Sequence, residues 1–193
     1  MKKENFIEQI EQDLLHAQQS PLYKYRQQNK YLPVIGEGSL EAEIMFVGEA
    51  PGKKEAETGK PFCGRAGKLL NLHLEKINLA REDIYITNIV KDRPPQNRDP
   101  SAEEISFYTP FLMRQIDIMQ PAIIVTLGRF SSYHLLKILT GKEKRYPMLE
   151  MTGKVFLFEK GKIVPLIHPA AVIYDRKKEK LFEEGLSVLK KEL

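Results

Sequence analysis

The stretch that decides the fold is EIMFVGEAPG, residues 43–52. Its first six residues are mostly apolar and end in Gly48, which favours a short buried β-strand. Glu49 follows at once, and a proline and a glycine come within the next three residues, as is typical of a tight loop. The stretch therefore predicts a buried strand with a carboxylate just past its carboxyl end.

Segments of similar character recur downstream and alternate with helical patterns. Runs rich in β-branched and aromatic residues predict strands at residues 83–88, 122–127, 155–158 and 163–167. Helical spacing of apolar residues predicts helices at residues 3–18, 65–77, 131–139 and 177–189. Ser101 and Glu104 have the spacing of a capping box that starts another helix. This alternation predicts a three-layer α/β/α fold whose central sheet has four to five mostly parallel strands.

Three other segments have no clear period, and we expect loops there. They are residues 19–42, 48–64 and 91–100. The last of these holds three prolines, which argue against regular structure. His168-Pro169 ends the last predicted strand, and another loop is expected after it.

Length and composition are those of an ordinary globular protein. The 193 residues predict one domain over positions 1–193, and 42% are hydrophobic while 29% are charged. No apolar run approaches the ~18 residues of a membrane span, and the first residues lack the apolar core of a secretory signal. A monomer is the default expectation.

The single cysteine and the mild charge limit the possible function classes. Cys63 alone cannot form an internal disulfide or a site built on several cysteines, so a reducing cytoplasm is the simplest setting. The net charge of +4 comes from 30 basic and 26 acidic residues. This excess permits a nucleic-acid partner but does not demonstrate one.

The carboxyl ends of parallel strands meet at one edge of a sheet, where ligands of open α/β sheets bind. Glu49, Asn88, Gly128 and His168 each stand at or just past the end of a predicted strand. One carboxylate, one amide and one imidazole should therefore converge at that edge.

Each of these side chains has a catalytic interpretation and a structural one. Glu49 can orient a water or stabilise a developing cation, or it can cap nearby amides. Asn88 carries one acceptor and two donors that match the edge of uracil, or it can form a turn. His168 can donate to a developing oxyanion, or it can be a satisfied structural histidine. His16, His73 and His134 lie in helical patterns and are interpreted as surface or packing residues.

Aromatic and basic residues near these strand ends suit a nucleic acid. Phe62, in a glycine-bounded loop, can stack on a planar base or anchor the loop in the core. Basic residues gather at 91–98 and at 176–180, where they suit either a phosphate backbone or a solvated surface.

Five ordered motifs between residues 20 and 176 carry a resemblance. They are GEAPG (48–52), GKPFCGRAGKLL (59–70), YITNIVK (85–91), RPPQNR (93–98) and HPAA (168–171). Together they resemble the uracil-DNA glycosylase superfamily, and most of all its family 4 of bacteria and archaea. The resemblance implies a DNA repair enzyme that hydrolyses the N-glycosidic bond of uracil in DNA and leaves an abasic site. The alternatives are a glycosylase for another deaminated base or for single strands, and a non-catalytic DNA- or protein-binding relative.

The resemblance also implies a role for each matched residue. Glu49 would activate water and His168 would hydrogen-bond uracil O2. The uracil-binding residues would be Glu49, Ala50, Pro51, Glu55, Phe62, Asn88 and His168, with Glu55 excluding the methyl group of thymine. Uracil-containing DNA would be held by Lys91, Arg93, Arg98 and Arg176, and a loop carrying Val172, Ile173 and Tyr174 would push into the duplex.

One departure from the family concerns a cofactor. Family 4 members usually hold a 4Fe-4S cluster on four cysteines, whose positions fall here at Ala17, Ser20, Asp92 and Tyr108. None of these is a cysteine, so we expect no cluster, and the chemistry itself requires neither a metal nor a redox cofactor. We expect Tyr23, Tyr108 and the N-terminal helix to fill the space.

Overall fold

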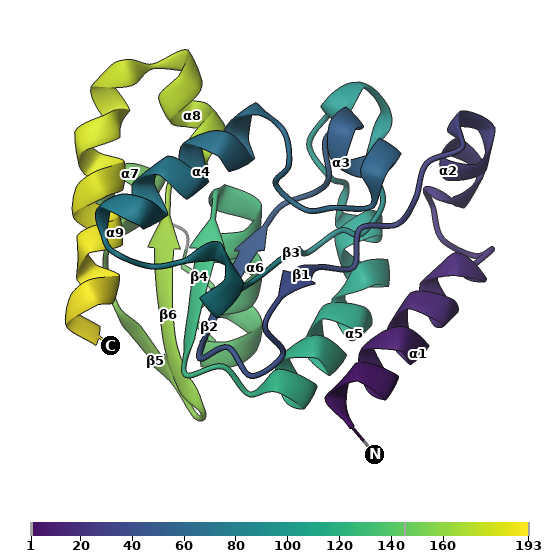
Figure 1. Ribbon diagram of the computed structural model, residues 1–193, viewed down its shortest axis with the longest axis horizontal. Helices are drawn as coiled ribbons and strands as arrows, with labels where there is room; N and C mark the ends of the chain where they lie inside the picture. Colours follow the sequence, from purple (N-terminus) through teal and green to yellow (C-terminus); the bar gives the residue numbers. More distant parts are fainter. Residues whose placement is uncertain (1, 145, 193) are drawn as a thin grey trace.

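A six-stranded sheet forms the centre of the computed structural model, which describes residues 2–144 and 146–192 (Figure 1). The strands are β1 (Glu37–Gly38), β2 (Ile44–Gly48), β3 (Tyr85–Asn88), β4 (Ile123–Leu127), β5 (Phe156–Phe158) and β6 (Gly161–Leu166), in the order β1-β3-β2-β4-β6-β5. The four central strands are parallel, while β1 and β5 pair antiparallel at the two edges. The mostly parallel α/β sheet is thus confirmed, with one more strand than expected because β1 forms inside the predicted loop 19–42.

Helices cover both faces of the sheet. They are α1 (Lys3–Leu15), α2 (Tyr23–Asn29), α3 (Lys53–Thr58), α4 (Arg65–Lys76), α5 (Ala102–Met119), α6 (Arg129–Thr140), α7 (Met148–Met151), α8 (Pro169–Tyr174) and α9 (Glu179–Glu192). Single 3₁₀ turns lie at Arg81–Asp83, Pro95–Asn97 and Arg176–Lys178. Within the described ranges, no helix is both long enough and apolar enough to cross a membrane.

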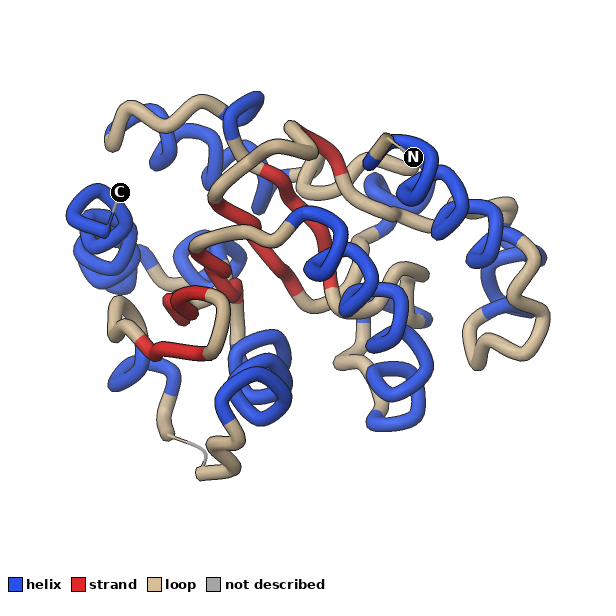
Figure 2. Tube along the Cα trace, turned by 90° about the horizontal axis from the view of Figure 1, so that it is seen from below, coloured by secondary structure: helices blue, strands red, loops and turns tan. Residues whose placement is uncertain are grey.

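Alternation along the strands divides the core into two halves. On β2, Ile44 and Phe46 pack with residues of α4, α8 and α9, whereas Met45 and Val47 pack with residues of α5, α6 and α7. A third cluster joins α1 and Leu22, the residue just before α2, to α5. Figure 2 shows the strands between the helical layers. The predicted three layers are therefore present, and the N-terminal helices add to one side.

The predicted loops contain short helices that the sequence analysis missed. Helices α2 and α3 lie within residues 19–42 and 48–64, and α8 follows His168 directly. Six or seven residues are too few to display a helical period in the sequence. Pro169 does not prevent α8, because a proline at the first helical position loses no intrahelical hydrogen bond.

A buried polar network joins the N-terminal helices to the segment after β3. Tyr108 donates from its hydroxyl to Asp92 Oδ2 at 2.6 Å, and its oxygen lies 2.6 Å from Ser20 Oγ. Arg26 Nη1 forms an ion pair with Asp92 Oδ2 at 3.1 Å and also donates to the carbonyl oxygen of Leu14. All of these side chains are buried. Removing one partner would leave a buried charge uncompensated, so the network fixes these segments together.

Helix α5 begins with the capping box that the sequence predicts. Glu104 N donates to Ser101 Oγ at 3.1 Å, and Ser101 N donates to Glu104 Oε2 at 2.8 Å. Arg98 adds two hydrogen bonds to the same carboxylate. The start of α5 is thereby tied to the loop that precedes it.

We expect Ser101→Ala to destabilise the fold by about 1 kcal/mol, because one helix N–H loses its acceptor. In thermal unfolding this corresponds to a melting temperature roughly 2–4 °C lower. Ser106→Ala, at an exposed position in the second turn of α5, is the matched control and should leave the melting temperature unchanged or slightly higher. Equal losses in both variants would contradict the capping role.

Candidate active site

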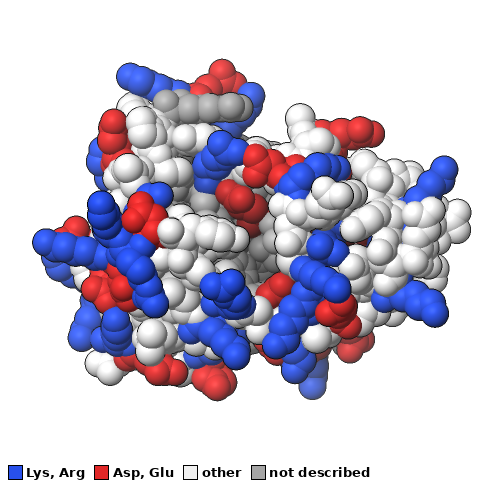
Figure 3. Space-filling model, turned by 90° about the horizontal axis from the view of Figure 1, so that it is seen from above, with Lys and Arg blue, Asp and Glu red and all other residues white. Residues whose placement is uncertain are grey.

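A pocket of about 600 Å³ opens at the edge where the parallel strands end. Its lining includes ten of the residues singled out from the sequence: Glu49, Ala50, Pro51, Glu55, Phe62, Asn88, Arg98, His168, Ile173 and Tyr174. Figure 3 looks onto this side of the molecule and shows lysine and arginine side chains around a hollow in which acidic side chains lie. Lys91, Arg93, Val172 and Arg176 are not in the lining.

The floor of the pocket depends on a glycine. Gly48 stands opposite Asn88 in the register of β2 and β3. A Cβ atom at Gly48 would collide with Asn88 Oδ1 and with the ring of Phe62. The absence of a side chain at this position is therefore what allows the amide and the aromatic ring to approach each other.

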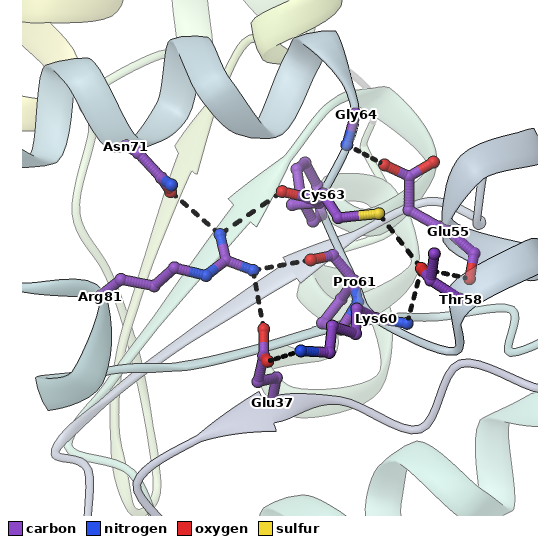
Figure 4. A network of polar contacts seen from close by, with 10 residues as sticks. Glu37, Glu55, Thr58, Lys60, Pro61, Cys63, Gly64, Asn71 and Arg81 are labelled. Carbon is purple, nitrogen blue, oxygen red and sulfur yellow. Dashed lines mark hydrogen bonds and ion pairs between the residues drawn. The ribbon is translucent and has the colours of Figure 1, made fainter.

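The loop that carries Phe62 is fixed by the guanidinium of Arg81 (Figure 4). Arg81 donates to the carbonyl oxygen of Pro61 at 2.6 Å and to Asn71 Oδ1 at 2.9 Å, and it forms an ion pair with Glu37 at 3.3 Å. Phe62 itself has a left-handed φ of 48°, a conformation that the surroundings must hold for a non-glycine residue. The ring of Phe62 stacks on that of His168 with centroids 5.7 Å apart.

Glu55 links α3 to the start of α4. Its Oε1 accepts a hydrogen bond of 2.6 Å from Gly64 N, which is drawn in Figure 4. Gly64 is the N-cap of α4 and has no side chain of its own with which to cap the helix. The half-buried Glu55 carboxylate thus supplies an acceptor at that helix start and also faces the pocket.

The carboxylate of Glu49 contacts the first turn of α6. Its Oε1 accepts a hydrogen bond of 3.1 Å from Phe130 N, and Gly128, with φ +101°, leaves space for the carboxylate. Burial raises the pKa of Glu49, although the Phe130 N–H acts in the opposite direction. The capping contact that the sequence analysis offered as the structural alternative is therefore present, and the same carboxylate lines the pocket.

His168 has a defined tautomer. Its Nδ1 accepts a hydrogen bond of 3.1 Å from Ala170 N at the start of α8, so the ring proton resides on Nε2. Burial lowers the pKa of His168 to about 4, so the imidazole is neutral near pH 7. A neutral ring with an Nε2–H donor can stabilise negative charge without carrying a charge of its own.

Lys91 does not lie on a DNA-facing surface, contrary to the expectation from its basic neighbours. Its side chain is fully buried, and its Nζ donates to Thr87 Oγ1, to the carbonyl oxygen of Asn88 and to Gln115 Oε1 at 2.5–2.8 Å. Burial lowers the pKa of Lys91 strongly. The residue holds the end of β3, and thus the backbone of Asn88, in place.

The three candidates for insertion into a duplex differ in exposure. Val172 is fully buried and packs in the core, so it cannot leave the protein without disrupting that core. Ile173 is half-buried, and Tyr174 is 88% exposed at the end of α8. Only Tyr174 projects freely, because α8 directs successive side chains to different sides.

The remaining predicted arginines have partners. Arg93 donates to Asn97 Oδ1 and to the Tyr31 hydroxyl, and Arg98 is paired with Glu104. Arg176 lies in the 3₁₀ turn after α8, with 73% of its side chain exposed, and it forms an ion pair with Glu179 at 3.2 Å.

Three exposed basic residues at the pocket were missed by the sequence analysis. They are Lys53, Lys54 and Arg65, at the first turns of α3 and α4. The glycines of the sequence motifs, Gly52 and Gly64, directly precede the two helices and could have indicated where each helix starts. Because α3 was not predicted, the sequence analysis could not place Lys53 and Lys54 at a helix start beside the pocket. Arg81 and the Phe130 N–H were missed because their roles depend on contacts distant in sequence.

The sequence was compared with known proteins. Residues 35–190 match the family model of the uracil DNA glycosylase superfamily. The chain is 41% identical over 189 residues to the type-4 uracil-DNA glycosylase of Sulfurisphaera tokodaii, covering 95% of this chain and 83% of that protein. It is 39% identical over 173 residues to the type-4 uracil-DNA glycosylase of Thermotoga maritima, covering 85% and 86%. The chain therefore belongs to the uracil-DNA glycosylase superfamily.

Proposed function

We propose that residues 1–193 act as one uracil-DNA glycosylase domain, which hydrolyses the N-glycosidic bond of uracil in DNA and leaves an abasic site. The observation that carries the proposal is the fixed tautomer of His168, whose Nε2–H donor belongs to the same pocket as Glu49, Phe62 and Asn88. A neutral donor, a carboxylate, an aromatic ring and an amide are what the cleavage of a planar base from a sugar requires.

The target base must first leave the helix. Flipping costs a few kcal/mol of stacking and pairing energy. Tyr174 is the exposed side chain that fills the space the base vacates, and Phe62 stacks on the flipped ring. The Asn88 amide accepts from uracil N3–H and donates to O4, and Glu55 stands where it opposes a methyl group at C5.

The glycosidic bond then stretches toward a cationic sugar and a uracil anion. His168 Nε2–H donates to O2 as negative charge collects on the leaving base. Glu49 stabilises the sugar cation and orients a water, whose hydroxyl adds to C1′ while its proton goes to the uracil anion. Both groups act more strongly on the transition state than on the bound substrate, which is the condition for catalysis.

Phosphates of the DNA are held by basic side chains around the pocket. We assign this role to Arg93, Arg98 and Arg176, and we add Lys53, Lys54 and Arg65 because they are exposed at the pocket. Contacts of this kind position the duplex without reading its sequence.

The proposed function is tested with a duplex oligonucleotide that contains one uracil. Cleavage of the abasic product by alkali should appear on a gel, together with release of free uracil, and an otherwise identical thymine duplex should stay intact. Binding of the duplex without release of uracil would favour a non-catalytic DNA-binding relative. Release of a different deaminated base, but not of uracil, would favour a glycosylase for that base.

We expect His168→Ala and Glu49→Gln each to slow single-turnover excision roughly a hundredfold to a thousandfold, because each removes one transition-state interaction. Glutamine at position 49 keeps an oxygen that can accept the Phe130 N–H, so this variant removes charge without removing the cap. Binding to an abasic-site duplex should change little.

The exposed residues His16 and Glu57 provide matched controls. His16→Ala and Glu57→Gln should excise uracil at the parent rate. A variant at position 49 or 168 that also keeps the parent rate would remove that residue from the mechanism. Loss of abasic-site binding as severe as the loss of activity would assign it a structural role instead.

Asn88→Asp should reduce excision of uracil roughly 5- to 150-fold, because a matched donor at a buried edge is lost at about 1–3 kcal/mol. A protonated aspartate can donate to cytosine N3 and accept from N4, so cytosine excision is measured in the same assay. Asn29→Asp, at an exposed position in α2, is the control and should be unaffected. Unchanged uracil excision by Asn88→Asp would exclude Asn88 as the reading residue.

We also propose that this chain holds no 4Fe-4S cluster, unlike the family pattern. The positions that would carry the cysteines are Ala17, Ser20, Asp92 and Tyr108, and a cluster needs thiolate ligands. The last three are instead joined by hydrogen bonds, and Arg26 neutralises the buried Asp92. Tyr23 contributes through the face of its ring, which lies 5.2 Å from the Arg26 guanidinium.

Purified protein should therefore be colourless and contain no stoichiometric iron by elemental analysis, even after expression with added iron and sulfide. Iron at about four atoms per chain, with visible absorption, would overturn the proposal. Iron content and uracil excision are measured on the same preparation, so an active preparation without iron supports both proposals at once.

A further inference from the structure

His73, on α4, is buried without a hydrogen bond. Its side chain has no exposed surface, and it is the one residue among those described whose fully buried side-chain nitrogens, both of them, have no hydrogen-bond partner. A buried polar atom without a partner is costly, at about 1–3 kcal/mol. The expected packing role explains the contact of its ring with Phe182, at 5.3 Å between centroids, but not the two ring nitrogens.

Two carboxylates of α9 face this ring. Glu179 Oε1 lies 3.5 Å and Glu183 Oε1 lies 3.9 Å from His73 Nε2. The two glutamates are four residues apart, so they share one face of the helix. The C-terminal end of α4 meets α9 in Figure 1, and the three ligand atoms all lie within 4.8 Å of one another.

We propose that His73, Glu179 and Glu183 bind a divalent transition-metal cation, with Zn²⁺ as the best-fitting ion, and that this ion clamps α9 to α4. Nitrogen and carboxylate ligands bind Zn²⁺ at about 2.0–2.2 Å, so neighbouring ligands of a tetrahedral ion are about 3.4 Å apart. The observed separations of 3.5 and 3.9 Å from the imidazole nitrogen are close to this value. Solvent supplies the fourth ligand, because both glutamates are partly exposed.

Each of the two carboxylates also forms an ion pair with a basic side chain, Glu183 with Lys76 and Glu179 with Arg176. Lys76 Nζ forms an ion pair with Glu183 Oε1 at 2.6 Å, the same oxygen that faces His73. Arg176 pairs with the other oxygen of Glu179, Oε2, and so leaves Oε1 available. The ion pair between Lys76 and Glu183 must therefore break when the metal binds, whereas the ion pair between Arg176 and Glu179 can persist.

The test uses Zn²⁺ alone, added to the metal-free full chain. Equilibrium dialysis should give about one tightly held zinc per chain, and Zn²⁺ at about a hundredfold above its dissociation constant should raise the melting temperature by roughly 5–10 °C. Mg²⁺, which prefers oxygen ligands, should produce no such rise. Co²⁺ should develop the visible absorption of a tetrahedral nitrogen–oxygen site.

Variants separate this site from incidental zinc binding. Glu179→Gln, Glu183→Gln and His73→Gln should each abolish the rise, and the two glutamates are exposed enough to be replaced without unfolding the protein. His16→Gln, which removes an exposed histidine, should keep the rise in full. Lys76→Met should tighten zinc binding roughly tenfold, because a competing charge is removed. A rise that persists in Glu183→Gln, or the absence of zinc binding by the parent, would overturn the proposal.

Discussion

The pocket depends on the missing side chain of Gly48. Because β2 and β3 are parallel and in register, Gly48 lies opposite Asn88, and both stand at the last position of their strands. The space a Cβ would occupy at Gly48 is taken by the Asn88 amide and the Phe62 ring. Any larger residue would push apart the two groups for which we propose contacts to uracil, Asn88 with its edge and Phe62 with its face. Close backbone approach of this kind is a common reason for a glycine at a site.

Two adjacent buried ionisable side chains fix the chain where it leaves the end of β3. Lys91 is held by Thr87, Asn88 and Gln115, and Asp92 is held by Arg26 and Tyr108. Neither side chain can move to the surface without losing its buried hydrogen-bond partners. The loop that carries Arg93 and Arg98 therefore starts from a rigid anchor, although its residues 96–99 are exposed.

The sequence was sufficient to predict a pocket residue where the position of that residue follows from the order of the strands alone. Glu49, Asn88 and His168 come together because parallel strands end at one edge, and that rule needs only the strand positions. The sequence was insufficient to predict that Lys91 and Val172 are buried. Neither a run of basic residues nor a segment that follows a strand indicates which of its side chains point into the core. Short elements caused the same difficulty: the six-residue α8 buries Val172 and exposes Tyr174, and no period of that length can be recognised in advance.

The structural and catalytic interpretations of Glu49 and His168 describe different atoms of the same groups. Glu49 receives the Phe130 N–H at Oε1, and a carboxylate has further lone pairs with which to accept a water. His168 accepts the Ala170 N–H at Nδ1, and this leaves the proton on Nε2, the donor that the proposed mechanism directs at the leaving base. In both cases a helix start supplies the N–H that orients the side chain, α6 for the carboxylate and α8 for the imidazole. The capping contacts thus orient two otherwise flexible side chains, and under the proposed mechanism this orientation exists before the substrate binds.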